Sequence, residues 1–391
     1  VMQELSKTFL KDNPGVKLNW YVLPENILRQ RIFSSLAISD NLFDVMTIGA
    51  YDTQIYAKNT WISPLGNLPV EYEVQDLLTS VKDALTYNKE LFALPFYAES
   101  SMTFFRTDLF EKAGIQMPTR PNYAQIKEFA AKLHRPEEGV YGICLRGKAG
   151  WGENMAIVST MINTYGGSWF DMNWHPQINS KSWQTAITMY SDLLEGYGPP
   201  SGPDNGFGEN LKLFAEGHCA MWVDATVAAG MLYDRKLSKV HDKVGFTNAP
   251  IGSVDKGSHW AWSWALAIPA SSARKDLAKN FITWATSKNY IQLVGKTHGW
   301  VSVPPGTRRS TYQNELYRNA APASSGLRCP RPGRPQPDLR GLQRLRPRSR
   351  DELVRPHPSP PPSPARPRRG PPLAPVDGRK GLRGEQLPRA A

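Results

Sequence analysis

Aromatic side chains, isoleucine and methionine are absent from the last part of this 391-residue chain. Residues 323–391 contain no Phe, Trp, Tyr, Ile or Met, the side chains whose burial offsets the entropy lost on ordering. They hold 15 Arg, 1 Lys and 5 acidic residues, which gives a net charge of +11. The whole chain has 47 basic and 35 acidic residues, so residues 1–322 contain 31 basic and 30 acidic residues. We predict a disordered, basic, Arg- and Pro-rich tail at 323–391 after a folded part with almost no net charge.

Three interpretations of this tail compete. It is a segment that binds acidic partners, a flexible linker, or the product of out-of-frame translation of GC-rich DNA. We favour the third, because it explains the abrupt change in composition and the excess of Arg over Lys together. Once the tail is set aside, net charge gives no argument for a specific nucleic-acid partner.

Cysteine is scarce, and long apolar runs are missing. The three cysteines, Cys144, Cys219 and Cys329, show no CxxC or Cys/His spacing typical of a metal site, so we predict no metal and no cofactor. A disulfide between Cys144 and Cys219 is possible, but we favour two buried free thiols. No run approaches the roughly 18 apolar residues of a membrane span, and no signal peptide is visible at the start.

Helical and strand-like patterns alternate from the first residues onward. The apolar spacing predicts helices at 2–13, 26–36, 108–113, 123–133, 154–165, 182–194, 210–215 and 275–287. It predicts strands at 17–22, 43–48, 91–95, 102–105, 140–144, 220–223, 244–246 and 264–268. This alternation favours α/β domains with mostly parallel sheets.

Tryptophan is abundant, and three of the twelve alternate just before and at the start of the predicted strand 264–268. If residues 260–264 are also extended, Trp260, Trp262 and Trp264 project to the same face, since side chains two residues apart in a strand share a face. Such a face is either part of the core or a platform for the C–H surfaces of a sugar or polyol. The neighbouring His259 and Ser263 favour exposure of at least Trp260 and Trp262.

Polar side chains follow several predicted strands. Asp224 stands where a strand gives way to a helix, where its carboxylate would cap the helix or accept hydrogen bonds from ligand hydroxyls. The segments 48–52, 96–101 and 147–154 repeat this placement and contribute Tyr51, Glu99 and Trp151. The third segment lacks the GxxxxGK[ST] spacing of a phosphate-binding loop.

Catalytic signatures are poor. The sequence contains no GxSxG, HExxH or GxGxxG motif. Four acidic residues could still supply the paired carboxylates of a glycosidase: Glu99, Glu153, Asp171 and Asp224. A carbohydrate-active hydrolase is therefore the alternative to a binding protein.

Several segments, taken together, carry a family resemblance. They are residues 43–48 (FDVMTI), 94–100 (LPFYAES), 105–114 (FRTDLFEKAG), 213–222 (LFAEGHCAMW), 264–269 (WALAIP) and 278–287 (AKNFITWATS). In these segments the chain resembles family 1 of the extracellular solute-binding proteins of ABC transporters, over roughly residues 2–322. Residues 142–154 (GICLRGKAGWGEN) and 300–308 (WVSVPPGTR) are most similar to the sorbitol- and mannitol-binding group.

The resemblance implies the two-lobe α/β fold of periplasmic binding proteins, with a ligand cleft between the lobes. The first lobe would comprise 1–106 and 259–308, and the second lobe 107–258 with a return at 309–322. It also implies a periplasmic monomer that captures a polyol such as sorbitol or mannitol, or a related sugar, without catalysis, and delivers it to the membrane subunits of an ABC permease. The candidate ligand-binding residues are Glu25, Tyr51, Glu99, Arg106, Trp151, Asp224, Trp260 and Trp262.

For two of these candidates, Glu25 and Arg106, surface ion pairing is an equally good interpretation. The chain also departs from the family pattern at both ends. Members begin with a signal peptide and a first strand, and they continue past residue 321 with further helices of the second lobe, where this sequence has its basic tail.

Overall fold

The computed structural model describes residues 1–23, 25–150 and 152–320. The predicted tail and the candidate Trp151 lie outside the described residues. Among the helices in this described part, none is long and apolar enough to cross a membrane.

Helices form much of this part of the chain, and local sequence explains several of them. The helix at 123–133 has the predicted bounds, because Asn122 Oδ1 accepts a hydrogen bond from the Gln125 N–H at 2.8 Å, while Gln125 Oε1 accepts one from the Asn122 N–H at 3.0 Å. The helices are α1 (Met2–Asp12), α2 (Glu25–Ile38), α3 (Ala50–Lys58), α4 (Thr79–Ala84), α5 (Thr107–Lys112), α6 (Tyr123–Leu133), α7 (Asn154–Thr164), α8 (Lys181–Tyr197), α9 (Phe207–Glu216), α10 (Ala229–Leu232), α11 (Lys275–Ala285), α12 (Lys288–His298), α13 (Arg309–Gln313) and α14 (Glu315–Ala320).

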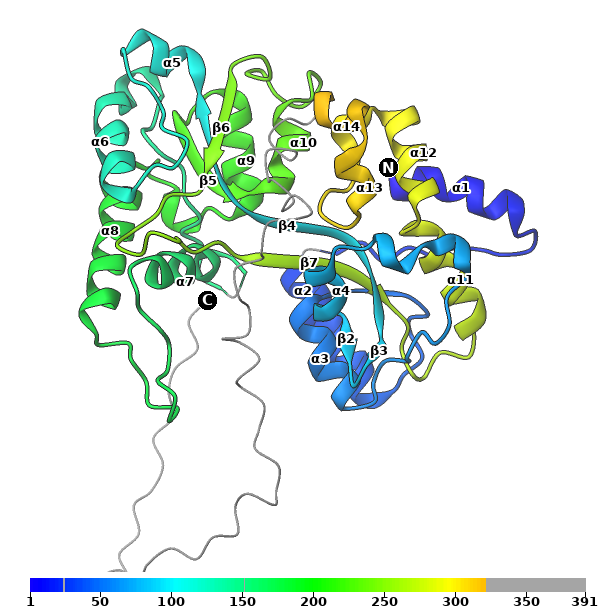
Figure 1. The fold of residues 1–391 in the computed structure, drawn as a ribbon. Helices are drawn as coiled ribbons and strands as arrows, with labels where there is room; N and C mark the ends of the chain where they lie inside the picture. The colour runs from blue at the N-terminus through cyan, green and yellow to red at the C-terminus, as the bar shows by residue number, and fades with distance from the viewer. Residues whose placement is uncertain (24, 151, 321–391) are drawn as a thin grey trace, which may run out of the picture. The chain divides into compact units, whose positions relative to one another are not determined.

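One long strand joins two groups of elements (Figure 1). The first half of this strand, β4 (Ala93–Arg106), pairs with β7 (Ala261–Ala267), which in turn pairs with β1 (Met46–Gly49). The second half of β4 lies between β5 (Met221–Ala225) and β6 (Val244–Asn248). A short hairpin is formed by β2 (Thr86–Tyr87) and β3 (Glu90–Leu91). The paired strands β4 and β7 thus cross from one group of elements to the other.

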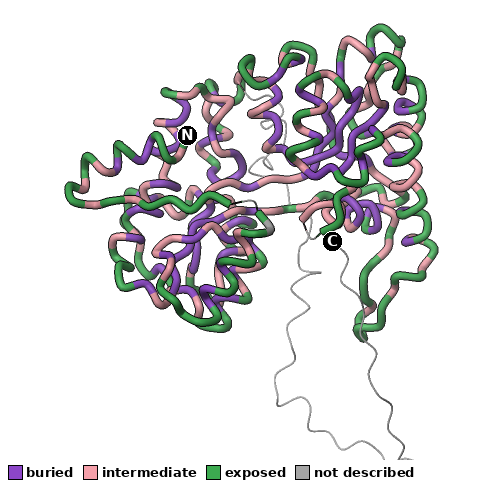
Figure 2. Tube along the Cα trace, turned by 180° about the vertical axis from the view of Figure 1, so that it is seen from behind, coloured by how far each residue is buried: buried purple, intermediate pink, exposed green. Residues whose placement is uncertain are grey.

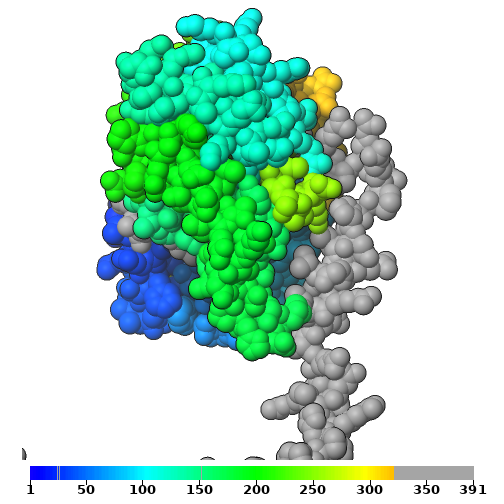
Figure 3. Space-filling model, turned by 90° about the vertical axis from the view of Figure 1, so that its left-hand side faces the viewer, coloured from blue at the N-terminus to red at the C-terminus, as the bar shows by residue number. Residues whose placement is uncertain are grey.

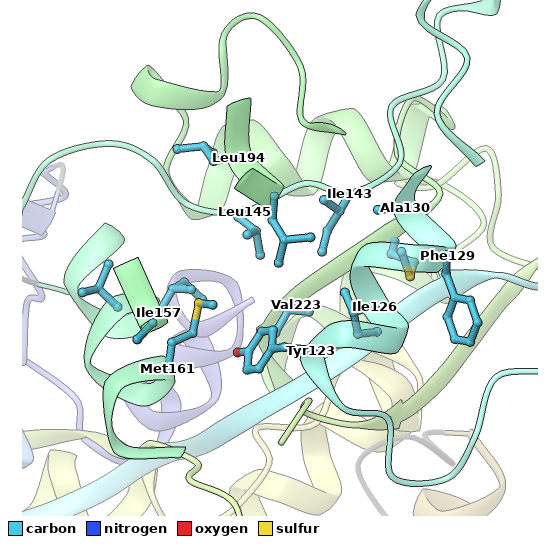
Figure 4. Packing of buried hydrophobic residues seen from close by; sticks show 14 of the residues in the cluster. Tyr123, Ile126, Phe129, Ala130, Ile143, Leu145, Ile157, Met161, Leu194 and Val223 are labelled. Atoms are coloured by element: carbon cyan, nitrogen blue, oxygen red, sulfur yellow. The ribbon is translucent and has the colours of Figure 1, made fainter. Parts of the chain in front are cut away.

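Each group has its own apolar core, as Figure 2 shows by the buried segments. In one core, residues of α6, α7 and β5 such as Ile126, Met161 and Val223 pack together (Figure 4). The segments from α5 to α8, drawn in cyan to green, make up most of the face seen in Figure 3. In the other group, a core that includes Ile32 and Ile48 packs α2 and α3 against β1 and β7. Each group thus has apolar clusters of its own, as two lobes require.

The last described helices close on the beginning of the chain. Tyr317 of α14 packs with Leu5 of α1 and with Tyr290 of α12. Before these helices, the side chain of Arg308 is completely buried, where it stacks on Tyr72 at 4.5 Å and donates a hydrogen bond to the Tyr72 carbonyl at 2.9 Å. The predicted lobe boundaries, including a return of 309–322 to the second lobe, stay a prediction.

Several strand predictions are wrong. All pairings between the named strands are antiparallel, and parallel pairing is confined to isolated bridges in the described residues, such as the one between Cys144 and Trp222. Residues 17–22 form no strand, and residues 140–144 make only isolated bridges, which are parallel at Tyr141 and Cys144 and antiparallel at Val140. The apolar pattern identifies segments that pair but carries no information on their direction.

The preference for free thiols is also wrong. Cys144 and Cys219 form a disulfide, with 5.9 Å between their Cα atoms. The two cysteines meet because residues 141–144 run beside the start of β5, where the Cys144 N–H donates a hydrogen bond to the Met221 carbonyl at 2.8 Å. Cysteines 75 positions apart in the sequence give no sign of this proximity.

Candidate functional site

A cavity of about 780 Å³ lies beside the strands that cross between the two groups of elements. Its walls come from α2, α3, β4 and β7 on one side and from α7, the preceding loop and the start of α9 on the other. The volume falls within the roughly 300–1,000 Å³ of small-molecule sites. A site with walls from both groups can enclose a ligand when the groups approach each other.

Aromatic rings form one wall. Trp262 and Trp264 both face the cavity from β7, and their ring centroids lie 5.5 Å apart. The ring of Tyr51, near the start of α3, lies 5.5 Å from that of Trp262. Trp260, just before β7 begins, also lines the cavity. All three alternating tryptophans therefore reach the site.

The position of Trp262 depends on a glycine and an arginine behind it. At Gly49, the last residue of β1, an added Cβ would lie 2.2 Å from Trp262 Cζ2, so only glycine leaves room for the ring. Arg29 lies over the rings of Trp262 and Trp264, at 5.4 and 5.1 Å from their centroids. Its guanidinium is held by both carboxylate oxygens of Asp52, at 3.0 and 3.2 Å.

Arg146 and Asp224 form a buried ion pair at the opposite wall. Arg146 Nη2 and Nε donate hydrogen bonds to the Asp224 carboxylate at 2.6 and 3.0 Å. Asp224 has no exposed surface and also accepts hydrogen bonds from Trp222 Nε1 at 3.0 Å and from the Ala225 N–H at 2.6 Å. Burial opposes the charge of Arg146, but Asp224 overcomes this and raises the pKa of the guanidinium. Arg146 therefore keeps its positive charge at this wall.

Arg146 is fixed by more than its counter-ion. Its Nη1 donates a hydrogen bond to the Gly152 carbonyl at 2.6 Å, and its guanidinium lies 5.2 Å from the centroid of the Phe207 ring. The Arg146 carbonyl accepts a hydrogen bond from the Tyr190 hydroxyl at 2.8 Å. Because Arg146 also lines the cavity, these contacts hold a cation in one orientation at the wall.

Glu99 of β4 faces the same cavity and has an unusual pKa. Burial raises the pKa of its carboxyl to about 7; Arg146 opposes the shift, while Asp224 and Glu25 add to it. Near neutral pH, Glu99 is therefore divided between a protonated form, which can donate a hydrogen bond, and an ionised form, which only accepts one.

This pKa makes stability depend on pH. Because the folded pKa of Glu99 lies above the ordinary value of 4.5, the folded state binds more protons between these values, and stability falls as pH rises. The contribution of the Glu99 carboxyl to the free energy of unfolding is fully present below about pH 4.5 and is lost as pH rises through about 7. Glu99→Gln should flatten this slope in melting temperatures measured from pH 5 to 8, whereas replacement of an exposed carboxylate of α6, Glu128→Gln, should not. Equal slopes in all three proteins would contradict the assignment.

The structure brings together five of the eight candidates, which line the cavity: Glu25, Tyr51, Glu99, Trp260 and Trp262. Asp224 stands behind Arg146 rather than at the surface of the cavity. Arg106 does not line the cavity; its guanidinium pairs with both carboxylate oxygens of Asp108, at 2.6 and 2.8 Å, but the arginine is buried and the pair is not the surface ion pair considered for it. Trp151 lies outside the described residues.

Other lining residues were not among the candidates. Arg146 lies just before the Gly-rich segment 147–154, from which only Trp151 was a candidate, and its partner Asp224 is 78 positions away. Tyr97 alternates with Glu99 on β4, a signal that could have identified it. Trp169, in the loop between α7 and α8, has no periodic pattern around it. Within the described part of the chain, no group of three or more His, Cys, Asp or Glu could hold a metal ion.

Comparison with known proteins decides the family. The model of the bacterial extracellular solute-binding proteins matches residues 1–290. The chain belongs to this family. The family and the solved relatives also confirm the expected fold of periplasmic binding proteins.

Some relatives in this solute-binding protein family are much more similar than others. The mannitol-binding protein of Pseudomonas aeruginosa is 51% identical over 321 residues, which cover 82% of this chain and 73% of that protein. The structure of a solute-binding protein from Agrobacterium vitis with bound D-mannitol is 48% identical, with a TM-score of 0.81, and the match covers 83% of this chain and 78% of that one. A ribitol complex from Agrobacterium radiobacter, at 24% identity and a TM-score of 0.74, supports the fold alone.

Family membership also decides between binding and catalysis. The protein is a transport-related solute-binding protein and not an enzyme, so the hydrolase alternative is wrong. Asp224, one of the carboxylates considered for catalysis, is fully buried and bound to Arg146, which leaves it no surface for attack on a substrate.

Proposed function

We propose that this protein is the substrate-binding component of an ABC importer and that its ligand is a linear polyol of the hexitol class, mannitol or sorbitol. The observation that carries the proposal is the 51% identity over 321 residues to a mannitol-binding protein, which is supported by the 48% identity to a mannitol-bound structure. We further propose that it works as a periplasmic monomer and delivers the polyol to the membrane subunits of the permease.

The cavity suits such a ligand chemically. A hexitol has a carbon chain whose C–H surfaces can cover aromatic rings, and Trp260 and Trp262 bring such rings to the cavity. Each carbon also carries a hydroxyl, which needs a donor or acceptor once water is displaced. Glu25, Glu99 and Arg146 supply such groups around the rings. Approach of the two lobes would then remove the ligand from water.

Titration calorimetry on the full chain tests this proposal. We expect mannitol and sorbitol to bind with measurable heat, and a hundredfold excess over Kd to add about 2.7 kcal/mol to stability, seen as a rise in melting temperature. Maltose, a cyclic disaccharide, serves as the matched control and should bind much more weakly. Absence of both heat and thermal shift with both hexitols would show that the polyol assignment is wrong.

A further inference from the structure

The charges that line the cavity do not cancel. Three strongly acidic or basic residues line it, namely Glu25, Glu99 and Arg146. The charge of Arg146 is already balanced by Asp224, with hydrogen bonds of 2.6 and 3.0 Å. Because Asp224 already neutralises Arg146, the carboxyl groups of Glu25 and Glu99 give the lining of the cavity an excess of acidic groups.

The groups behind the wall increase this excess. Arg29, which pairs with Glu25 at 3.1 Å, is shared with Asp52 at 3.0 Å. Arg146 is likewise shared, since Glu153 lies 3.9 Å from its Nη1, although Lys148 offsets part of the charge of Glu153. His259 adds no cation at neutral pH, because burial lowers the pKa of its imidazole below 6.5. Each arginine at the site therefore faces two carboxyl groups.

Both lining carboxyl groups approach the same region. An added Cβ at Gly152 would lie 3.5 Å from Glu25 Oε1, and the Gly152 carbonyl accepts the hydrogen bond from Arg146 Nη1 at 2.6 Å. Glu25 thus reaches across the cavity to the segment that orients Arg146. Glu99, opposite Trp262 in the β4–β7 ladder, feels the charges of both Glu25 and Arg146.

The aromatic wall complements a positive charge as well as a carbon chain. Ring faces carry partial negative charge and attract cations within about 6 Å of the centroid. Arg29 already uses the rings of Trp262 and Trp264 in this way, at 5.4 and 5.1 Å. A cavity that combines surplus carboxyl groups with several ring faces is therefore better matched to a cationic ligand than to an anionic one.

We infer that this cavity accepts a cationic polyol, a linear alditol with a terminal ammonium group, and that Glu25 and Glu99 bind the ammonium group. The inference rests on the proposed function, because the rest of the ligand is the polyol chain. It also gives a direction of selectivity: ammonium-bearing alditols bind, while sugar acids and polyol phosphates are excluded by like charge.

A series of three ligands tests the inference on the full chain at pH 7.5. The ligands are mannitol, 1-amino-1-deoxymannitol and mannonate, which share a carbon skeleton and differ in charge; an alkyl amine is protonated at this pH. The amine should bind at least as tightly as mannitol, and mannonate at least about tenfold more weakly. Added salt should weaken amine binding and leave mannitol binding nearly unchanged.

Two glutamine variants and a control variant test whether Glu25 and Glu99 bind the ammonium group. Glu25→Gln and Glu99→Gln should each lower the ratio of amine to mannitol affinity, by about threefold to tenfold. Glu128→Gln, an exposed carboxylate on α6 outside the cavity, should leave the ratio unchanged. Should Glu99→Gln fail to fold, Glu25→Gln and the wild-type ligand series still decide the matter, because the Glu25 side chain is 51% exposed.

The outcomes separate this inference from the proposed function. Tight mannitol binding with amine binding more than tenfold weaker overturns the inference alone. So does an affinity ratio that neither glutamine variant changes. Amine binding without mannitol binding supports the inference on charge and overturns the hexitol assignment, while failure of both ligands to bind overturns both.

Discussion

Asp224→Ala is expected to destabilise the folded protein by about 3–5 kcal/mol, because it leaves the buried cation of Arg146 without its counter-ion. The guanidinium would keep its hydrogen bond to the Gly152 carbonyl at 2.6 Å, Glu153 at 3.9 Å and the attraction of the Glu99 carboxyl. Polyol affinity should fall as well, since Arg146 would no longer be held in one orientation at the cavity wall. Urea denaturation and calorimetry measure the two effects.

A control and a double variant make this expectation specific. Asp192→Ala removes an exposed carboxylate paired with Lys127 and should cost at most about 1 kcal/mol. Replacing both charges, with Arg146→Met and Asp224→Leu, should recover most of the stability, since apolar substitutes for a buried ion pair are often tolerated. Binding should stay lost, because the double variant lacks the lining cation.

The contrary result has a clear meaning. If Asp224→Ala left the free energy of unfolding unchanged and weakened only the binding of polyol, the carboxylate would contact the ligand directly. A cap on the following turn would give a third pattern, with a loss of about 1 kcal/mol in stability and unchanged affinity. The three patterns are distinguishable with the same two measurements.

The apolar spacing of the sequence predicted most of the helices but not the crossing strand. The α6 bounds at 123–133 follow from its cap and its apolar face, both of which are local. The strand β4 was predicted as two pieces, 91–95 and 102–105, because Glu99, Ser100 and Ser101 interrupt its apolar pattern. In the structure these residues stay extended, since the ladder passes from β7 to β5 at this point. Only the folded arrangement supplies those two neighbours.

In the site, too, the features that depend on nearby residues in the sequence were predictable, and those that depend on distant residues were not. The alternation of Trp260, Trp262 and Trp264 is local, and all three line the cavity. Asp224 was recognised as a polar residue at a strand end, but its role depends on Arg146, which comes from a distant loop. A single sequence contains no signal that connects such a pair.

Gly49→Ala should weaken polyol binding although Gly49 itself lies behind the cavity wall. A Cβ at this position would lie 2.2 Å from Trp262 Cζ2 and 2.3 Å from Cη2, so the indole has to move. Overpacking of this kind typically costs about 1–3 kcal/mol, and the displaced ring intrudes on the space in which the ligand binds. We expect a loss of affinity of about tenfold or more. Gly196→Ala on α8, where an added Cβ meets no atom within 4 Å, is the matched control.

A double-variant cycle tests whether this effect passes through Trp262. Trp262→Ala should itself lower polyol affinity by at least about 2 kcal/mol, as is usual for a central aromatic contact. If Gly49→Ala acts only by displacing the indole, it should have almost no further effect on affinity in the Trp262→Ala background, where the space it needs is empty. Additive losses in the cycle would instead mean that Gly49→Ala disturbs the hydrogen bond from its own N–H to Asp52, which measures 2.9 Å and in turn supports Arg29.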